Sequence, residues 1–386
     1  MKIERRAVYT GIILAIILTI WLRLLLLLIG YNLSIRIEQI PLTTEEMAYS
    51  QNIPTDKTDR WYHFVQPLHR FDALLYEQIA KTNYQNNSLT TVFFPLYPWV
   101  VNGLAKFIAV TYPISAFIIN TVLTALVFFL LYYLTYMDHP KKIAVRTVLI
   151  YATFPAAFFL LTPYAEPLFF VFVLLALIFA KKNRLLPTVV TGSLAAMTKS
   201  YGVVIVLPLM MLFITKNSIK QKLISILLLL LVPLSFLGVI KYQDHLAGSS
   251  FSIFQTYDNL WKGKIPMPLT PLLSQLEVAF NFPFDLPNDV NLIVVIVTIV
   301  FLLKTYRKIS RDKWVLVFVF FLIFYLYLYN GRQLFSVSRH ALIFFPLFTY
   351  LAKFKIDRSY EVIYIGSSVF LMVMFFIWYT LGFFVA

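Results

Sequence analysis

The 386-residue sequence contains no cysteine, which excludes disulfides, thiolate chemistry and metal sites built on cysteine. Only 13% of its residues are charged, about half the share of an ordinary soluble domain. Glycine is scarce, at 11 residues, and neither a P-loop nor a GxGxxG pattern occurs, so no nucleotide-phosphate motif is visible. The 5 histidines show no metal-ligand spacing, and we interpret them as structural or interfacial residues.

Apolar residues are what the chain has in abundance: 60% are hydrophobic and 17% aromatic, and the mean hydropathy is +0.77. This composition predicts an all-α, polytopic transmembrane helical bundle with about 11–12 hydrophobic helices in a membrane lipid bilayer. The formal net charge of +15 comes from short basic clusters between apolar runs. Such clusters are typical of cytoplasmic loops, so we do not expect nucleic acid as a partner.

The first apolar run extends from residue 8 to residue 30 and follows Lys2, Arg5 and Arg6. It predicts a spanning helix with a cytoplasmic N-terminus. We expect a multi-pass protein of the plasma membrane if the source is bacterial, or of the endoplasmic reticulum if it is eukaryotic. Arg23 interrupts this run. Its side chain is expected either to face the bundle or to snorkel to the outer interface, and both interpretations stay open here.

Apolar runs separated by short breaks make up most of the chain after residue 92. The five basic clusters between them can all be cytoplasmic only if one early run does not cross the membrane. The run 93–111 contains Pro95, Pro98, Asn102 and Lys106 and is the best candidate for a re-entrant or interfacial helix. The C-terminus is then expected outside. The predicted runs are 93–111, 113–136, 145–162, 164–180, 185–198, 201–215, 222–241, 289–304, 314–329, 340–352 and 361–384.

We expect a single integral membrane domain over residues 1–386, with large outer loops at 31–92 and 242–288. The first loop is far longer than a connection requires, which favours a functional role. Shorter polar breaks are expected on the same face. They lie at 162–166, 198–202 and 330–340.

Within the first outer loop, the apolar periodicity of residues 71–81 predicts a short helix. His69, Asp72 and Tyr76 are spaced so that they can share one face. Asp72 opens the helix and is interpreted either as an N-cap or as a catalytic base.

Cations at the other outer breaks can hold an anion. Lys199, Arg332 and Arg339 are candidates, although Lys199 and Arg339 also fit the role of ordinary interfacial anchors. A carboxylate base combined with such cations suits transfer from a phosphate-activated, membrane-embedded donor.

Several segments appear in an ordered set that resembles the PIG-V family of mannosyltransferases. The similarity is closest over residues 65–205 and looser beyond them. Its segments are Arg70-Phe71-Asp72-Ala73, Asn83-Tyr84, Phe93-Phe94-Pro95-Leu96-Tyr97-Pro98, Phe154-Pro155-Ala156-Ala157, Pro163-Tyr164-Ala165-Glu166, Thr198-Lys199-Ser200-Tyr201-Gly202, and Arg339 followed by Phe345-Pro346.

The resemblance implies a membrane glycosyltransferase of GT-C type that uses a polyprenyl- or dolichyl-phosphate sugar and, as is usual for such enzymes, inverts the anomeric centre. We expect no cofactor, and no metal because the sequence shows no metal-ligand spacing. The acceptor would be a glycan or glycolipid on the outer or lumenal face. It implies that Asp72 is the base and that Tyr164 and Glu166 position the donor or acceptor. The set of substrate-binding residues expected around them is His69, Arg70, Tyr76, Tyr97, Tyr164, Glu166, Lys199 and Arg339.

Two positions depart from the family pattern, which usually has tryptophan before the aspartate and glycine before the tyrosine. Phe71 and Asn83 stand there instead. Because of these changes, the resemblance does not specify the eukaryotic glycosylphosphatidylinositol substrate. A bacterial envelope enzyme with another acceptor stays open. The competing interpretation is a polytopic transporter or lipid-linked sugar flippase, which should show paired halves with broken helices. A structural scaffold explains neither the long outer loop nor Arg23.

Overall fold

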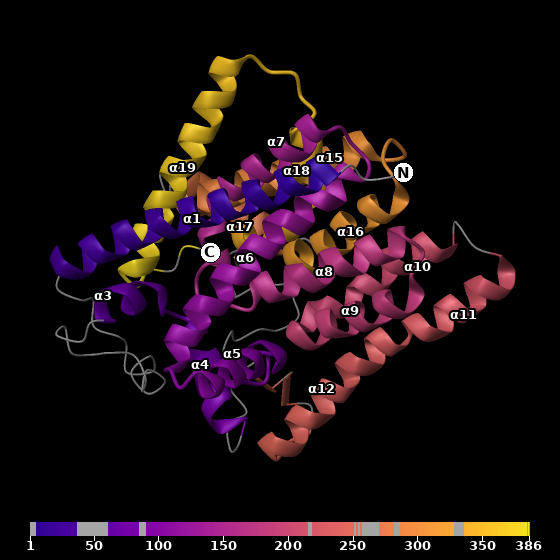
Figure 1. The fold of residues 1–386 in the computed structure, drawn as a ribbon, viewed down its shortest axis with the longest axis horizontal. Coiled ribbons are helices and arrows are strands. Elements are labelled where there is room, and N and C mark those ends of the chain that lie inside the picture. The colour runs from indigo at the N-terminus through magenta and orange to yellow at the C-terminus, as the bar shows by residue number, and fades with distance from the viewer. Residues whose placement is uncertain are drawn as a thin grey trace. The chain divides into compact units, whose positions relative to one another are not determined.

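The computed structural model describes residues 5–36, 61–84, 90–214, 218–250, 252–253, 255–256, 270–281, 286–327, 336–383 and 385. Every regular element in these ranges is a helix, which confirms the all-α prediction for this part of the chain (Figure 1). Most of the first outer loop before residue 61, and Arg332 in the 330–340 break, lie outside the described ranges.

Five helical stretches are long and apolar enough to cross a bilayer, so the chain has the build of a multi-pass membrane protein. They are α1 (Arg5–Arg36), α6 (Tyr112–Tyr136), the nearly continuous pair α11 (Ile219–Leu229) and α12 (Leu231–Ala247), α15 (Leu286–Thr305) and α19 (Arg358–Thr380).

The other apolar runs form shorter helices than a simple span requires. The run 145–162 divides into α7 (Lys141–Ala152) and the 3-10 turn η3 (Ala157–Leu160), with Pro155 between them. Proline lacks an N–H donor and disfavours helix in the residue before it, which explains the break. The predicted runs 164–180, 185–198 and 201–215 form short helices: α8 (Glu166–Lys181), α9 (Leu185–Thr198), the 3-10 segment η4 (Ser200–Ile205) and α10 (Val206–Ile214).

Two helices enter the predicted second outer loop, 242–288. α12 continues to Ala247, where Gly248 ends it with a left-handed φ of 69°, and α14 (Thr270–Asn281) lies within the segment; its outer location stays a prediction.

The chain divides into two compact units, and the single-domain prediction stays a prediction. The first unit comprises Met1–Asn83, Pro95–Val171 and Phe348–Val385. Its long helices α1 and α6 pack together closely. A Cβ atom added to Gly11 of α1 would lie 2.4 Å from the Tyr132 ring of α6, so glycine allows this approach.

Shorter elements of the first unit carry the segment around Asp72. They are α3 (Tyr62–Val65), the 3-10 turn η1 (Gln66–Leu68), α4 (Asp72–Thr82) and α5 (Leu96–Phe107). With 12 residues, α5 is about 18 Å long and cannot cross a hydrocarbon core of about 30 Å. Its length therefore agrees with an interfacial helix in the run 93–111, while the orientation of the chain stays a prediction.

The second unit comprises Tyr84–Phe94 and Phe172–Leu347, together with residue 386. Its core elements beyond those already given are α16 (Arg311–Phe321), the π-helix η5 (Leu322–Tyr327), α17 (Val337–His340) and the 3-10 turn η6 (Ala341–Ile343). α18 (Phe345–Leu351) continues from it into the first unit. α11 begins with a capping box in which Ser218 and Gln221 exchange side-chain and backbone hydrogen bonds.

Candidate functional site

The segment around Asp72 forms the helix that the periodicity predicts, shifted by one residue: α4 runs from Asp72 to Thr82. Phe71 occupies the cap position, with φ 51° and ψ −120°, and Asp72 is the first helical residue. The N-cap interpretation of Asp72 is therefore wrong. Its half-buried carboxylate instead lies in the first turn, where the helix dipole favours negative charge.

Phe71 has a backbone conformation that is costly for a residue with a side chain, and the surroundings hold it there. The Tyr164 and Tyr379 hydroxyls each donate a hydrogen bond to the carbonyl oxygen of Arg70, both at 3.3 Å. Tyr379 also donates to the Leu68 carbonyl at 2.9 Å, and its ring centroid lies 5.6 Å from that of Phe71. The position of Asp72 is thus fixed from the 162–166 break and from α19.

A buried ion pair between His69, which precedes α4, and Glu77 of α4 was missed by the sequence analysis. His69 Nε2 lies 2.8 Å from Glu77 Oε2, both side chains being fully buried, and Lys81 Nζ lies 3.1 Å from Glu77 Oε1. Burial raises the pKa of Glu77, but the hydrogen bonds and charges of His69 and Lys81 outweigh it and leave that pKa below its usual value. His69 therefore interacts with Glu77 through its Nε2 atom.

Tyr76 and Tyr97 belong to a buried polar network centred on Asn120 of α6. Their rings meet edge to face with centroids 5.1 Å apart, and the Tyr97 hydroxyl donates to Asn120 Oδ1 at 3.0 Å. Asn120 Nδ2 in turn donates to the carbonyls of Thr162 and Tyr164. Burial raises the pKa of Tyr97 well above its usual value, so its hydroxyl stays a donor.

Asn120 also escaped the sequence analysis, because a single amide inside an apolar run carries no pattern of its own. Its position as the eighth residue of the predicted run 113–136 is the only signal in the sequence. The hydrogen bonds show its role: it satisfies backbone carbonyls that the break leaves outside a helix.

Arg23 supports the same break from α1. Its guanidinium donates to the Leu161 carbonyl at 3.0 Å and to Thr121 Oγ1 at 2.6 Å, and it lies 4.0 Å from the Phe117 ring centroid. The bundle-facing interpretation is confirmed, and snorkelling is wrong. Beyond the break, Glu166 opens α8 with a 1% exposed side chain and lies within electrostatic range of Tyr97.

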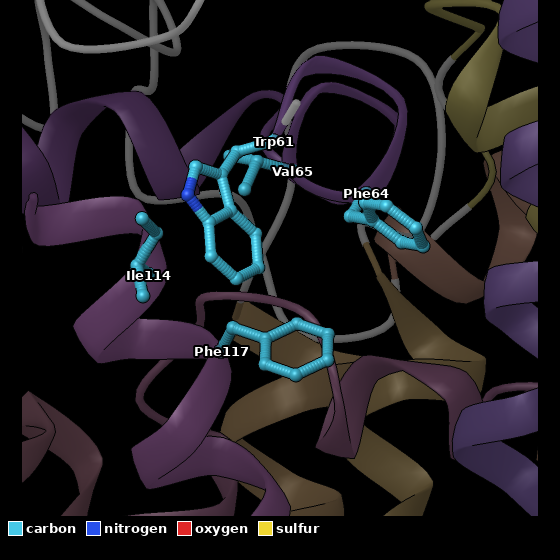
Figure 2. A pocket seen from close by; sticks show the side chains of 5 residues that line it. All are labelled: Trp61, Phe64, Val65, Ile114 and Phe117. Atoms are coloured by element: carbon cyan, nitrogen blue, oxygen red, sulfur yellow. The ribbon is translucent and has the colours of Figure 1, made fainter. Parts of the chain in front are cut away.

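A small apolar pocket of about 90 Å³ lies between α3 and α6. Figure 2 shows Trp61 and Phe64 reaching toward Phe117, with Val65 and Ile114 completing the lining. Because Arg23 stacks on Phe117, this apolar surface adjoins the arginine that supports the 162–166 break.

Lys199 and Arg339 belong to the second unit and are both nearly buried, at 8% and 6% exposure. Lys199 lies in extended conformation between α9 and η4, with Nζ 5.3 Å from the Tyr201 ring centroid. Tyr201 in turn meets the ring of His340, which neighbours Arg339, at 5.8 Å. Side chains buried this deeply do not match interfacial anchors, whose charged ends reach water.

The structure thus gathers seven predicted site residues in the first unit and two in the second. Within the described ranges, no group of three or more His, Asp or Glu side chains is placed to hold a metal ion. Comparison with protein-family models gives no match, and no curated protein matches the chain.

Proposed function

We propose that this chain is an integral membrane glycosyltransferase. It would move a sugar, mannose if the PIG-V resemblance extends to the donor, from a polyprenyl- or dolichyl-phosphate carrier to a hydroxyl of a glycan or glycolipid. The observation that carries the proposal is Asp72: a half-buried carboxylate at the start of α4, held behind the strained Phe71. Strained backbone of this kind clusters at functional sites.

In the proposed reaction, Asp72 accepts the proton of the acceptor hydroxyl while that oxygen attacks the anomeric carbon. The bond from the anomeric carbon to the donor's phosphate oxygen breaks, and its electron pair leaves with the phosphate. A new glycosidic bond forms from the opposite side, which inverts the configuration. The expectation that Lys199 and Arg339 hold the departing phosphate stays a prediction from the sequence; buried cations of this kind stabilise developing negative charge strongly.

The remaining residues act by positioning. Arg23, Asn120 and Tyr97 hold the 162–166 break, from which Tyr164 reaches the Arg70 carbonyl. Glu166, buried beside this network, is assigned to orient the donor or acceptor. The apolar pocket of Figure 2 offers a surface that suits the hydrocarbon chain of a lipid carrier.

A transporter or flippase for lipid-linked sugars is the second candidate, because Lys199 sits at a break between two short apolar helices. An in vitro assay distinguishes the two. Purified protein in liposomes is supplied with a panel of polyprenyl-phosphate sugars and a mixed extract of acceptor glycolipids. Appearance of a new glycosylated lipid supports the transferase. Movement of an unchanged donor across the bilayer, with no product from any donor, supports the transporter.

A further inference from the structure

A pocket of about 250 Å³ with a mixed polar and apolar lining lies where the end of α4 meets α5 and the start of α6. Figure 1 places α4 and α5 next to each other. Lys81 and Lys106 line the pocket, together with Asn102, Thr111 and Tyr112. Lys81 follows Asp72 by nine residues of helix, or about 13 Å, so this pocket is distinct from the candidate catalytic position.

The pocket carries an excess of positive charge. Lys81 is partly neutralised by Glu77, but Glu77 also accepts a hydrogen bond from His69. Lys106 is exposed and forms no ion pair with any residue that the structure describes. Besides Ala80, Ala105 and Val110, the lining contains lysine, amide and hydroxyl groups and no carboxylate, and these polar groups are suited to an anion.

Its walls are held in place by buried contacts. Asn102 Nδ2 donates to the Ala80 carbonyl at 3.0 Å and so ties α5 to the end of α4. Tyr112 is 4% exposed and packs edge to face on His69 at 6.4 Å. Among the described residues, its hydroxyl has no hydrogen-bond partner. The pocket therefore combines two cations with walls that are held by buried contacts.

The exposed residues of α5 indicate the environment around this pocket. Trp99, Val100 and Ile108 are each between 37% and 40% exposed, and Phe107 is 86% exposed beside Lys106. A short helix with exposed aromatic and aliphatic residues next to lysine is suited to the boundary between headgroups and acyl chains. The two ammonium groups would then lie at the depth of lipid phosphates.

We propose that this pocket is a binding site for a phosphate group, supplied by an anionic lipid headgroup or by a soluble phosphate. Its volume lies below the about 300–1,000 Å³ that drug-sized ligands need, so it fits a headgroup rather than an entire lipid-linked sugar. Lys81 and Lys106 hold the anion from α4 and α5. The inference does not depend on the proposed glycosyl transfer.

The test uses the purified full chain in detergent, titrated with short-chain phosphatidylglycerol or phosphatidylcholine and read by native mass spectrometry. Lys106→Ala removes one cation without touching the Glu77 pair, and Lys106→Arg restores the charge. Lys142→Ala, an exposed lysine of α7, is the matched control. We expect phosphatidylglycerol to be preferred, and its dissociation constant to rise on the order of tenfold in Lys106→Ala alone.

Inorganic phosphate is added as a competitor to identify the source. If inorganic phosphate displaces the lipid, and does so less effectively in Lys106→Ala, phosphate alone is recognised. If it does not displace the lipid, the lipid headgroup is required. Both results support a phosphate site at Lys106. Equal phosphatidylglycerol affinity in the original chain, Lys106→Ala and Lys142→Ala would overturn the proposal.

Discussion

At the scale of single residues, the carbonyl of Arg70 is the point on which the Asp72 segment depends. It accepts hydrogen bonds from Tyr164 and Tyr379, and these bonds offset the cost of the positive φ at Phe71. We predict that Tyr379→Phe lowers the free energy of unfolding by about 1–2 kcal/mol, because buried carbonyls lose a donor. Tyr360→Phe, at a 66% exposed position of the same helix, is the control and should unfold like the unmodified chain.

Glu77 shows how a buried charge depends on its partners. Glu77→Gln should lower the free energy of unfolding by about 3 kcal/mol, because it leaves the cation partner of a buried pair without a carboxylate. Glu361→Gln, which breaks the more exposed pair with Arg146 at 2.7 Å, should cost less than about 1 kcal/mol. Thermal unfolding in detergent, followed by tryptophan fluorescence, measures both. Equal costs would contradict the buried role of Glu77.

The same carboxylate predicts a pH dependence. The pKa of Glu77 is lower in the folded chain than its usual value of about 4.3, so its contribution is complete above that pH. This contribution to the free energy of unfolding disappears as the pH falls through the lowered pKa of Glu77 in the folded chain. We therefore expect the stability difference between the original chain and Glu77→Gln to stay constant near neutrality and to shrink below about pH 4. A difference that grows on acidification would show that the sign is wrong.

At the scale of elements, the break after α9 requires glycine. A Cβ atom at Gly202 would lie 2.4 Å from the Ala195 carbonyl oxygen, so η4 would have to move away from α9. We predict that Gly202→Ala destabilises the second unit by about 2 kcal/mol. Gly238→Ala in α12, where no atom lies within 4 Å, is the matched control and should be neutral or slightly stabilising. Circular dichroism during heating compares the two.

Periodicity predicted elements better than it predicted contacts. Residues 185–198 and 72–82 formed helices almost as expected, because their apolar spacing and flanking residues are local signals. The pairing of His69 with Glu77 and the bonds of Asn120 to the 162–166 break depend on how separate helices pack. Such contacts cannot be predicted from the local pattern of a single sequence. The N-cap interpretation of Asp72 was wrong for a related reason, because the hydrogen bonds of two tyrosines to the Arg70 carbonyl place Phe71 at the cap position.

At the scale of the whole chain, the basic clusters predict that the C-terminus lies outside, after a cluster at Lys353, Lys355 and Arg358 that lies inside. A reporter fused after Ala386 should be active on the outer face. A cytoplasmic signal would mean that the run 93–111 does cross. That result would also place the cluster at Lys141 and Lys142 on the opposite side from the one expected.

The central claim is that Asp72 is the base of a sugar transfer, and the most direct measurement compares transfer rates of Asp72→Asn and the unmodified chain. Asparagine keeps the size of the side chain but cannot accept the acceptor's proton. Asp138→Asn, at an exposed position after α6, is the control for loss of a carboxylate. We predict normal protein levels, a rate reduced on the order of 10²–10⁴-fold for Asp72→Asn, and an unchanged rate for Asp138→Asn. Near-normal transfer by a folded Asp72→Asn protein would contradict the account.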